Sequence, residues 1–242
     1  MHHHVKIKYA KDKYFNFKLE IGRRFVGNTR HSFNKDYNKV FCIGFHKTGT
    51  SSLAAALRKF GFKMGNQTVG EMLATDYFRK DYDRIIAFCE SAEAFQDTPF
   101  AFPELFKELD KSFPKSKFIL TIRDTPEQWF NSLVRFHTKK YSSDKQNPPT
   151  EKDLANAIYR YKGLPLETKK AYNWPETPLY EKYNYLKFYN KHINDVTSYF
   201  SHRPNDLLIL NVAQPGSYKQ LADFLNVPGV KEGERFPWLN KT

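Results

Sequence analysis

One stretch of the sequence, residues 40–60, restricts the possible folds more than any other. It begins with a short apolar run, Val40-Phe41-Cys42-Ile43-Gly44, which fits a strand buried on both faces of a parallel sheet. A loop of glycines and hydroxyl-bearing residues follows, and from Thr50 to Phe60 good helix formers place their apolar side chains on one face. A strand that passes through a tight loop into a helix is the opening unit of an α/β fold.

The rest of the chain repeats this alternation. Strands are predicted at 93–97, 117–122 and 207–210, and helices at 81–90, 102–113, 151–161, 180–200 and 218–225. Another helix begins after Thr125, because Thr125, Pro126 and Gln128 form a capping-box pattern. Parallel strands need helices on both faces of the sheet. We therefore expect a three-layer α/β/α, P-loop-like domain with about four or five parallel strands.

The loop between the first strand and its helix has the composition of an anion site. Its sequence is Gly44-Phe45-His46-Lys47-Thr48-Gly49-Thr50-Ser51-Ser52. Such a turn directs backbone N–H groups and the positive end of a helix at one point. The nucleotide-triphosphate loop has its lysine directly after the second glycine. Here Thr50 takes that place and Lys47 precedes Gly49, which weakens the interpretation as an ordinary ATPase.

The charge balance indicates an anionic partner. The chain of 242 residues carries a net charge of +13, and residues 1–40 hold ten Lys and Arg against three Asp and Glu. A positive field attracts nucleotides, nucleic acids and acidic glycans alike. Two rival functions therefore stay open: a P-loop kinase or NTPase that uses Mg-ATP, with Ser51 as a metal ligand, and a non-catalytic basic module that binds nucleotides or nucleic acid.

The chain divides into an arm and a domain. Residues 1–38 form a basic N-terminal arm, in which 5–21 alternate loosely as in a hairpin, and His2-His3-His4 is typical of a tag remnant. Residues 39–242 form the α/β domain. Within it, 138–178 is a polar, proline-broken insert that we expect to be rich in loops.

Composition also bears on the cellular location. Two cysteines in 242 residues argue against a disulfide scaffold and for a reducing compartment. No apolar run reaches the length of about 18–20 residues that a membrane span needs, and the polar N-terminus does not read as a secretory signal. These features predict a cytoplasmic protein, and the sequence does not indicate its oligomeric state.

The loop resembles that of one enzyme family. His46-Lys47-Thr48-Gly49-Thr50-Ser51-Ser52-Leu53 is similar to the 5′-phosphosulfate loop of sulfotransferases, which use 3′-phosphoadenosine 5′-phosphosulfate (PAPS). Their second signature is an arginine that ends a strand and a serine in the next helix. Arg123 and Ser132 fit that order, nine residues apart. The stretches 97–117, 221–228 and 236–240 also resemble one branch of the family, so the likeness extends over residues 39–240.

The resemblance assigns roles to named residues. Lys47 stabilises the leaving phosphate, and Thr48, Gly49, Thr50, Ser51 and Ser52 surround the 5′-phosphate with it. Arg123 and Ser132 hold the 3′-phosphate, unless Arg123 pairs instead with Asp124 or Glu127. The product is 3′,5′-ADP, and the family needs no metal. Many cytosolic members stack a tryptophan on adenine where this chain has Ser52, so what covers adenine is not evident.

The acceptor must lose a proton, and three residues are candidates for the base. Asp97 follows the second predicted strand, where related enzymes place His or Glu, and it would need a raised pKa. His46 and Glu93 are the alternatives.

The acceptor itself is expected to carry a hydroxyl or an amine, and to be a carbohydrate or an acidic molecule. The insert supplies cations and aromatic rings that suit it, and we expect it to form one wall of the acceptor cleft. The cations considered are Lys139, Lys140, Arg160, Lys169 and Lys170.

Overall fold

The computed structural model describes residues 35–237, and its centre is a parallel sheet of four strands. The strands are β1 (Val40–Cys42), β2 (Ala94–Phe95), β3 (Lys117–Thr121) and β4 (Leu207–Leu210). Their order across the sheet is β2-β1-β3-β4, and every neighbouring pair is parallel. The expected α/β fold with a parallel sheet is therefore confirmed. The predicted N-terminal hairpin lies outside the described residues.

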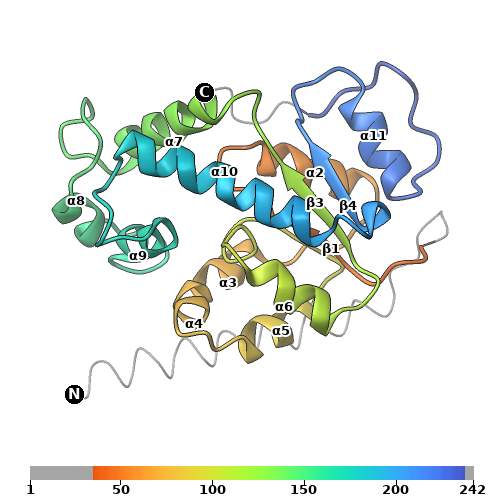
Figure 1. Ribbon diagram of the computed structural model, residues 1–242, viewed down its shortest axis with the longest axis horizontal. Coiled ribbons are helices and arrows are strands. Elements are labelled where there is room, and N and C mark those ends of the chain that lie inside the picture. The colour runs from red at the N-terminus through yellow and green to blue at the C-terminus, as the bar shows by residue number, and fades with distance from the viewer. Residues whose placement is uncertain (1–34, 238–242) are drawn as a thin grey trace.

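Helices cover both faces of this sheet (Figure 1). Before β2 come α2 (Thr50–Lys59), α3 (Gln67–Met72), α4 (Ala74–Phe78) and α5 (Asp83–Cys89), and α6 (Leu105–Ser112) links β2 to β3. Between β3 and β4 lie α7 (Pro126–Tyr141), α8 (Glu151–Asn156), α9 (Leu164–Glu167), the 3₁₀ helix η1 (Thr168–Tyr172), α10 (Lys182–Tyr199) and the 3₁₀ helix η2 (Pro204–Asp206). Helix α11 (Ser217–Phe224) follows β4.

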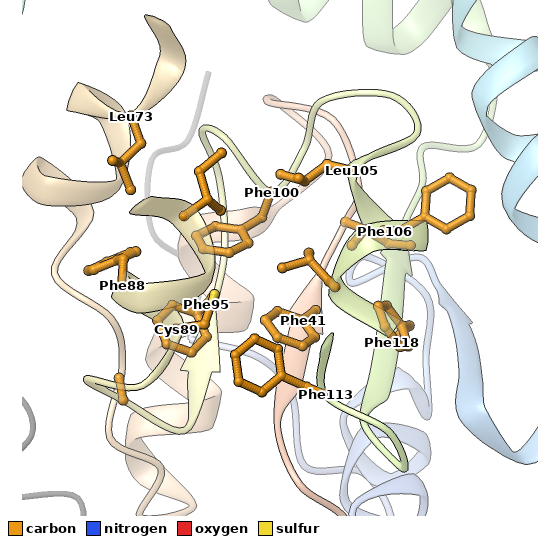
Figure 2. Packing of buried hydrophobic residues seen from close by; sticks show 14 of the residues in the cluster. Phe41, Leu73, Phe88, Cys89, Phe95, Phe100, Leu105, Phe106, Phe113 and Phe118 are labelled. Atoms are coloured by element: carbon orange, nitrogen blue, oxygen red, sulfur yellow. The ribbon is translucent and has the colours of Figure 1, made fainter. Parts of the chain in front are cut away.

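The period-two alternation of the strands builds two separate cores. In β1, Phe41 joins the cluster formed with α5, α6 and α10, while Val40 and Cys42 join the cluster formed with α2 and α11. Figure 2 shows the first core, in which the rings of Phe95, Phe100, Phe113 and Phe118 surround Phe41. Their ring centroids lie 5.5–6.0 Å from that of Phe41. This packing holds the helices of one layer against the sheet. It also fixes the position of β1, the strand that leads into the loop.

The strand order places a crevice above β1. The chain leaves β1 for β2 on one side and then returns to β3 on the other side. Ligands of open α/β sheets bind at such a switch point, outside the carboxyl ends of the strands. The loop after Cys42, the residues after Phe95 and those after Thr121 all meet at this edge.

Helix starts follow the local sequence closely. Thr125 caps α7, since its hydroxyl accepts a hydrogen bond of 3.1 Å from Gln128 N. The reciprocal half differs from the predicted box, because the Gln128 side chain accepts from Asp124 N at 3.0 Å, one residue before the cap. Helix α8 ends at Asn156 rather than 161, since Ala157 takes an extended backbone with ψ 135°.

The insert 138–178 is more helical than its composition suggests. It holds the end of α7 and all of α8, α9 and η1. Its prolines fit this arrangement, because Pro165 lies in the first turn of α9, where a missing N–H costs nothing. In Figure 1, α8 and α9 lie together at the side of the molecule away from α11. Within the described range 35–237, no helix is long and apolar enough to cross a membrane.

Candidate active site

Backbone geometry shapes the loop after β1. Lys47 and Gly49 have φ values of 70° and 101°, in the left-handed region. Gly49 is the N-cap of α2 and offers no side chain to its first N–H groups, and no acidic residue lies in that turn. Those groups and the positive helix end are therefore available to an anion. A Cβ at Gly49 would lie 2.3 Å from Val212 Cγ2, so glycine is required for packing as well as for φ.

Hydrogen bonds hold the loop from behind. Thr48 is buried, and its hydroxyl bonds to Phe45 O and to Thr121 Oγ1, both at 2.5 Å. Trp129 Nε1 donates to His46 O at 2.9 Å, and Arg123 Nε donates to Lys47 O at 2.7 Å. Three successive loop carbonyls are thus occupied, which leaves the opposite side of the loop facing open space.

That space is a cavity of about 300 Å³. Eight of the catalytic and nucleotide-binding candidates singled out from the sequence line it. They are His46, Lys47, Gly49, Thr50, Ser51, Ser52, Asp97 and Arg123. They come from the segments after β1, β2 and β3, so the fold brings together residues up to 77 positions apart. Thr48 is not part of the lining, because it holds the loop from below.

Three cations in the lining have no carboxylate within ion-pair distance among the described residues. They are Lys140, Arg123 and Lys47, whose ammonium lies 4.3 Å from the centroid of the Phe136 ring. Burial and the neighbouring Arg123 lower the pKa of Lys47. Asp124, an expected partner of Arg123, instead accepts hydrogen bonds of 2.7 Å from Asn211 and Gln214.

His46 and Asp97 form a pair that the sequence analysis named only as separate candidates. His46 Nδ1 contacts Asp97 Oδ1, and Thr98 N donates to the same oxygen at 2.8 Å. Burial raises the pKa of Asp97, but the imidazole and the Thr98 N–H outweigh it and bring this pKa below its usual value. Burial lowers the pKa of His46, yet the carboxylate raises it above its usual value overall. The raised pKa that an Asp97 base would need is therefore absent.

Two other candidate residues lie elsewhere. Glu93 precedes β2, where its carboxylate accepts from Lys63 N at 3.0 Å and from Lys35 Nζ at 3.3 Å, and it does not line the cavity. Ser132 is buried on α7 outside the lining, and its hydroxyl has no hydrogen-bond partner among the described residues. An orphaned buried hydroxyl costs about 1–3 kcal/mol unless something absent from the protein chain satisfies it.

Sequence reasoning missed part of the lining. One face of α7 contributes Leu133, Phe136, His137, Lys140 and Tyr141, of which the sequence analysis had named Lys140 as a cation of the insert. Their spacing is i, i+3, i+4, i+7, i+8, so the predicted helix carried a signal that could have found them.

Glu71 on α3 is a second omission. It accepts from Tyr159 OH at 3.0 Å and from Gln67 Nε2 at 2.9 Å, and it pairs with Arg160. No sequence signal marked it, because α3 is a six-residue helix without clear periodicity.

The insert reaches the cavity, but only some of its predicted cations do so. Tyr159, Leu164, Pro165 and Thr168 join Lys140 in the lining. Lys139 lines a separate surface groove, Lys170 is exposed, and Lys169 is buried with 2% of its surface accessible. Between residues 35 and 237, no three His, Cys, Asp or Glu side chains group together as metal ligands would.

The parallel sheet, whose first strand runs through a glycine loop into a helix, is the arrangement of P-loop-like proteins. The cations around that loop have the chemistry that would suit an anionic group. A family model described as "Sulfotransferase domain" matches residues 39–242. The chain belongs to this sulfotransferase family. A search of curated proteins found none that matches.

Proposed function

We propose that the protein is a PAPS-dependent sulfotransferase that moves a sulfuryl group to a hydroxyl or an amine. The observation that carries this proposal is the cavity itself, where an uncapped helix end, three cations without a described carboxylate partner and a His–Asp pair face one space. Family membership supports sulfuryl transfer in general, and the donor and the roles below are inferred from these contacts.

The donor half of the cavity suits a nucleotide with two phosphate sites. Thr50, Ser51 and Ser52 at the start of α2 would surround the 5′-phosphate, with Lys47 beside the bridging oxygen. As the bond from sulfur to that oxygen breaks, the Lys47 ammonium stabilises the charge that develops on the phosphate. Arg123 would hold the 3′-phosphate, and the orphaned hydroxyl of Ser132 supports a second contact there.

The His46–Asp97 pair would act as the base. Asp97 contacts Nδ1 and thereby orients the ring, which leaves Nε2 near Thr98 Oγ1 at 3.2 Å. The acceptor oxygen or nitrogen bonds to sulfur and its proton passes to Nε2. The carboxylate favours the imidazolium that results, as the raised pKa of His46 reflects. Asp97 then supports the base instead of being the base.

The acceptor would lie against the wall built by α7 and the insert. Lys140 Nζ stands 3.8 Å from the centroid of the Tyr159 ring, and Tyr141 lies beside them in the lining. A cation next to aromatic faces fits a carbohydrate or an acidic acceptor. The two free, buried cysteines, Cys42 and Cys89, fit a cytoplasmic location.

A ligand panel tests the proposed donor. Thermal unfolding is measured with 3′,5′-ADP, with ATP and Mg²⁺, and with a single-stranded oligonucleotide, because a ligand that binds the native state raises its stability by mass action. We expect the largest rise in Tm with 3′,5′-ADP, without added metal. A larger rise with Mg-ATP would favour the kinase alternative. A rise with the oligonucleotide alone, suppressed by salt, would favour a basic binding module.

A further inference from the structure

A second group of polar side chains lies behind the cavity, and the roles above do not use it. His137 on α7 lines the cavity, and its Nδ1 lies 3.0 Å from Lys169 Nζ and 3.0 Å from Tyr180 OH. Lys169 is 2% exposed, and no described carboxylate pairs with it. Among the described residues, Nδ1 of His137 is the one hydrogen-bond partner of this buried amine.

The charged form of Lys169 sets the tautomer of His137. Burial lowers the pKa of Lys169 to about 7. Below that pH its ammonium has only donors to offer, so Nδ1 accepts and the ring hydrogen resides on Nε2. The ring also stays neutral, since burial, then Lys169, then His46 and Lys47 bring its pKa well below the usual value. His137 is therefore a neutral donor that does not compete for the proton of the acceptor.

The other ring nitrogen, Nε2, is free to donate to a ligand in the cavity. His137 lines the same cavity as Lys47 and His46, and no described residue bonds to Nε2. We propose that His137 is a further catalytic residue, whose Nε2–H donates a hydrogen bond to a non-bridging oxygen of the transferred sulfuryl group. Lys169 and Tyr180 are positioning residues that act through it. This inference rests on the proposed sulfuryl transfer.

The expected effect is that of one donor aimed at the reacting group. Removal of such a donor lowers kcat by about 10²–10³-fold in comparable sites. Because 3′,5′-ADP has no sulfuryl group, its affinity should not depend on His137. The ratio between the affinities for PAPS and 3′,5′-ADP therefore reports this contact separately from general binding.

The first experiment compares two replacements of similar volume. H137F fills the space without a donor, whereas H137Q keeps an amide N–H near the position of Nε2. We expect H137F to lose about 100-fold in kcat with unchanged 3′,5′-ADP affinity, and H137Q to recover at least about tenfold of that loss. H137F with the wild-type kcat would overturn the proposal.

The second experiment reads the tautomer without any substrate. Nitrogen-15 NMR of histidine-labelled, full-length protein should show His137 as the neutral Nε2–H form at a pH below the lowered pKa of Lys169. K169M should lower kcat, but the double variant H137F/K169M should lose no more than H137F alone, because Lys169 acts through His137. An Nδ1–H ring, an imidazolium, or additive losses would overturn the assignment.

The two proposals fail in different ways. A wild-type protein that neither binds 3′,5′-ADP nor transfers sulfuryl would contradict the sulfotransferase function. An active wild type with an equally active H137F would contradict only the role of His137.

Discussion

Gly49→Ala tests whether the loop conformation is fixed by close packing as well as by backbone strain. Gly49 has a φ of 101°, and an added Cβ would lie 2.3 Å from Val212 Cγ2. Gly216 is a matched control, because it is also a helix N-cap, has a φ of 78°, and has no atom within 4 Å of an added Cβ. The two substitutions share the backbone cost but differ in the steric one.

The magnitudes follow from these geometries. A left-handed backbone costs an L residue about 1–2 kcal/mol, and a forced contact in packed structure costs about 1–3 kcal/mol more. We expect Gly49→Ala to lower the free energy of unfolding by about 2–5 kcal/mol and Gly216→Ala by about 1–2 kcal/mol.

Urea unfolding of both variants measures the difference. Adding Val212→Ala to Gly49→Ala removes the clashing methyl group and should give a favourable coupling free energy. Equal losses for the two glycines, with no coupling to Val212, would refute the packing argument.

Three further predictions concern the reaction. Lys47→Ala should lower kcat by about a hundredfold and PAPS affinity much less, since its contact strengthens as charge develops; steady-state kinetics and titration with PAPS separate the two effects. Asp97→Asn should lower the pKa of His46, because the carboxylate raises it. The acidic limb of the kcat/KM profile should therefore move to lower pH while the maximal rate falls. An unmoved limb would show that Asp97 does not act on the base. Lys140→Gln should raise the KM for the acceptor and leave that for PAPS unchanged, whereas Lys139→Gln, outside the cavity, should alter neither; equal effects of the two lysines would argue against the proposed acceptor wall.

The features predicted correctly from the sequence are those encoded locally. The strand before Gly44, the loop and the start of α2 lie within about twenty consecutive residues, and strand β4 was predicted with its observed bounds, Leu207–Leu210. The capping signal at Thr125 likewise needs only neighbouring residues. The presence of Asp97 and Arg123 in the cavity also follows from the sequence, because each comes soon after a parallel strand and parallel strands end at one edge of the sheet.

What depends on distant contacts could not be predicted in this way. Asp97 and His46 are 51 residues apart, so neither their pairing nor the lowered pKa of Asp97 could be read from the sequence. Glu93 and Asp97 bound the same predicted strand, but Glu93 precedes β2 and therefore lies at its amino end, away from the cavity. The helices α3 and α9 are too short for periodicity and are held by their tertiary contacts.

The central claim is that the cavity recognises a nucleotide with a 3′-phosphate through Arg123. Isothermal titration of 3′,5′-ADP and of 5′-AMP into the wild type, Arg123→Ala and the exposed control Arg135→Ala tests it most directly. A charge-assisted phosphate contact is worth about 1.5–3 kcal/mol, so Arg123→Ala should weaken 3′,5′-ADP by about ten- to a hundredfold and 5′-AMP far less, while Arg135→Ala changes neither. Equal losses for the two nucleotides, or no preference of the wild type for 3′,5′-ADP, would contradict the account.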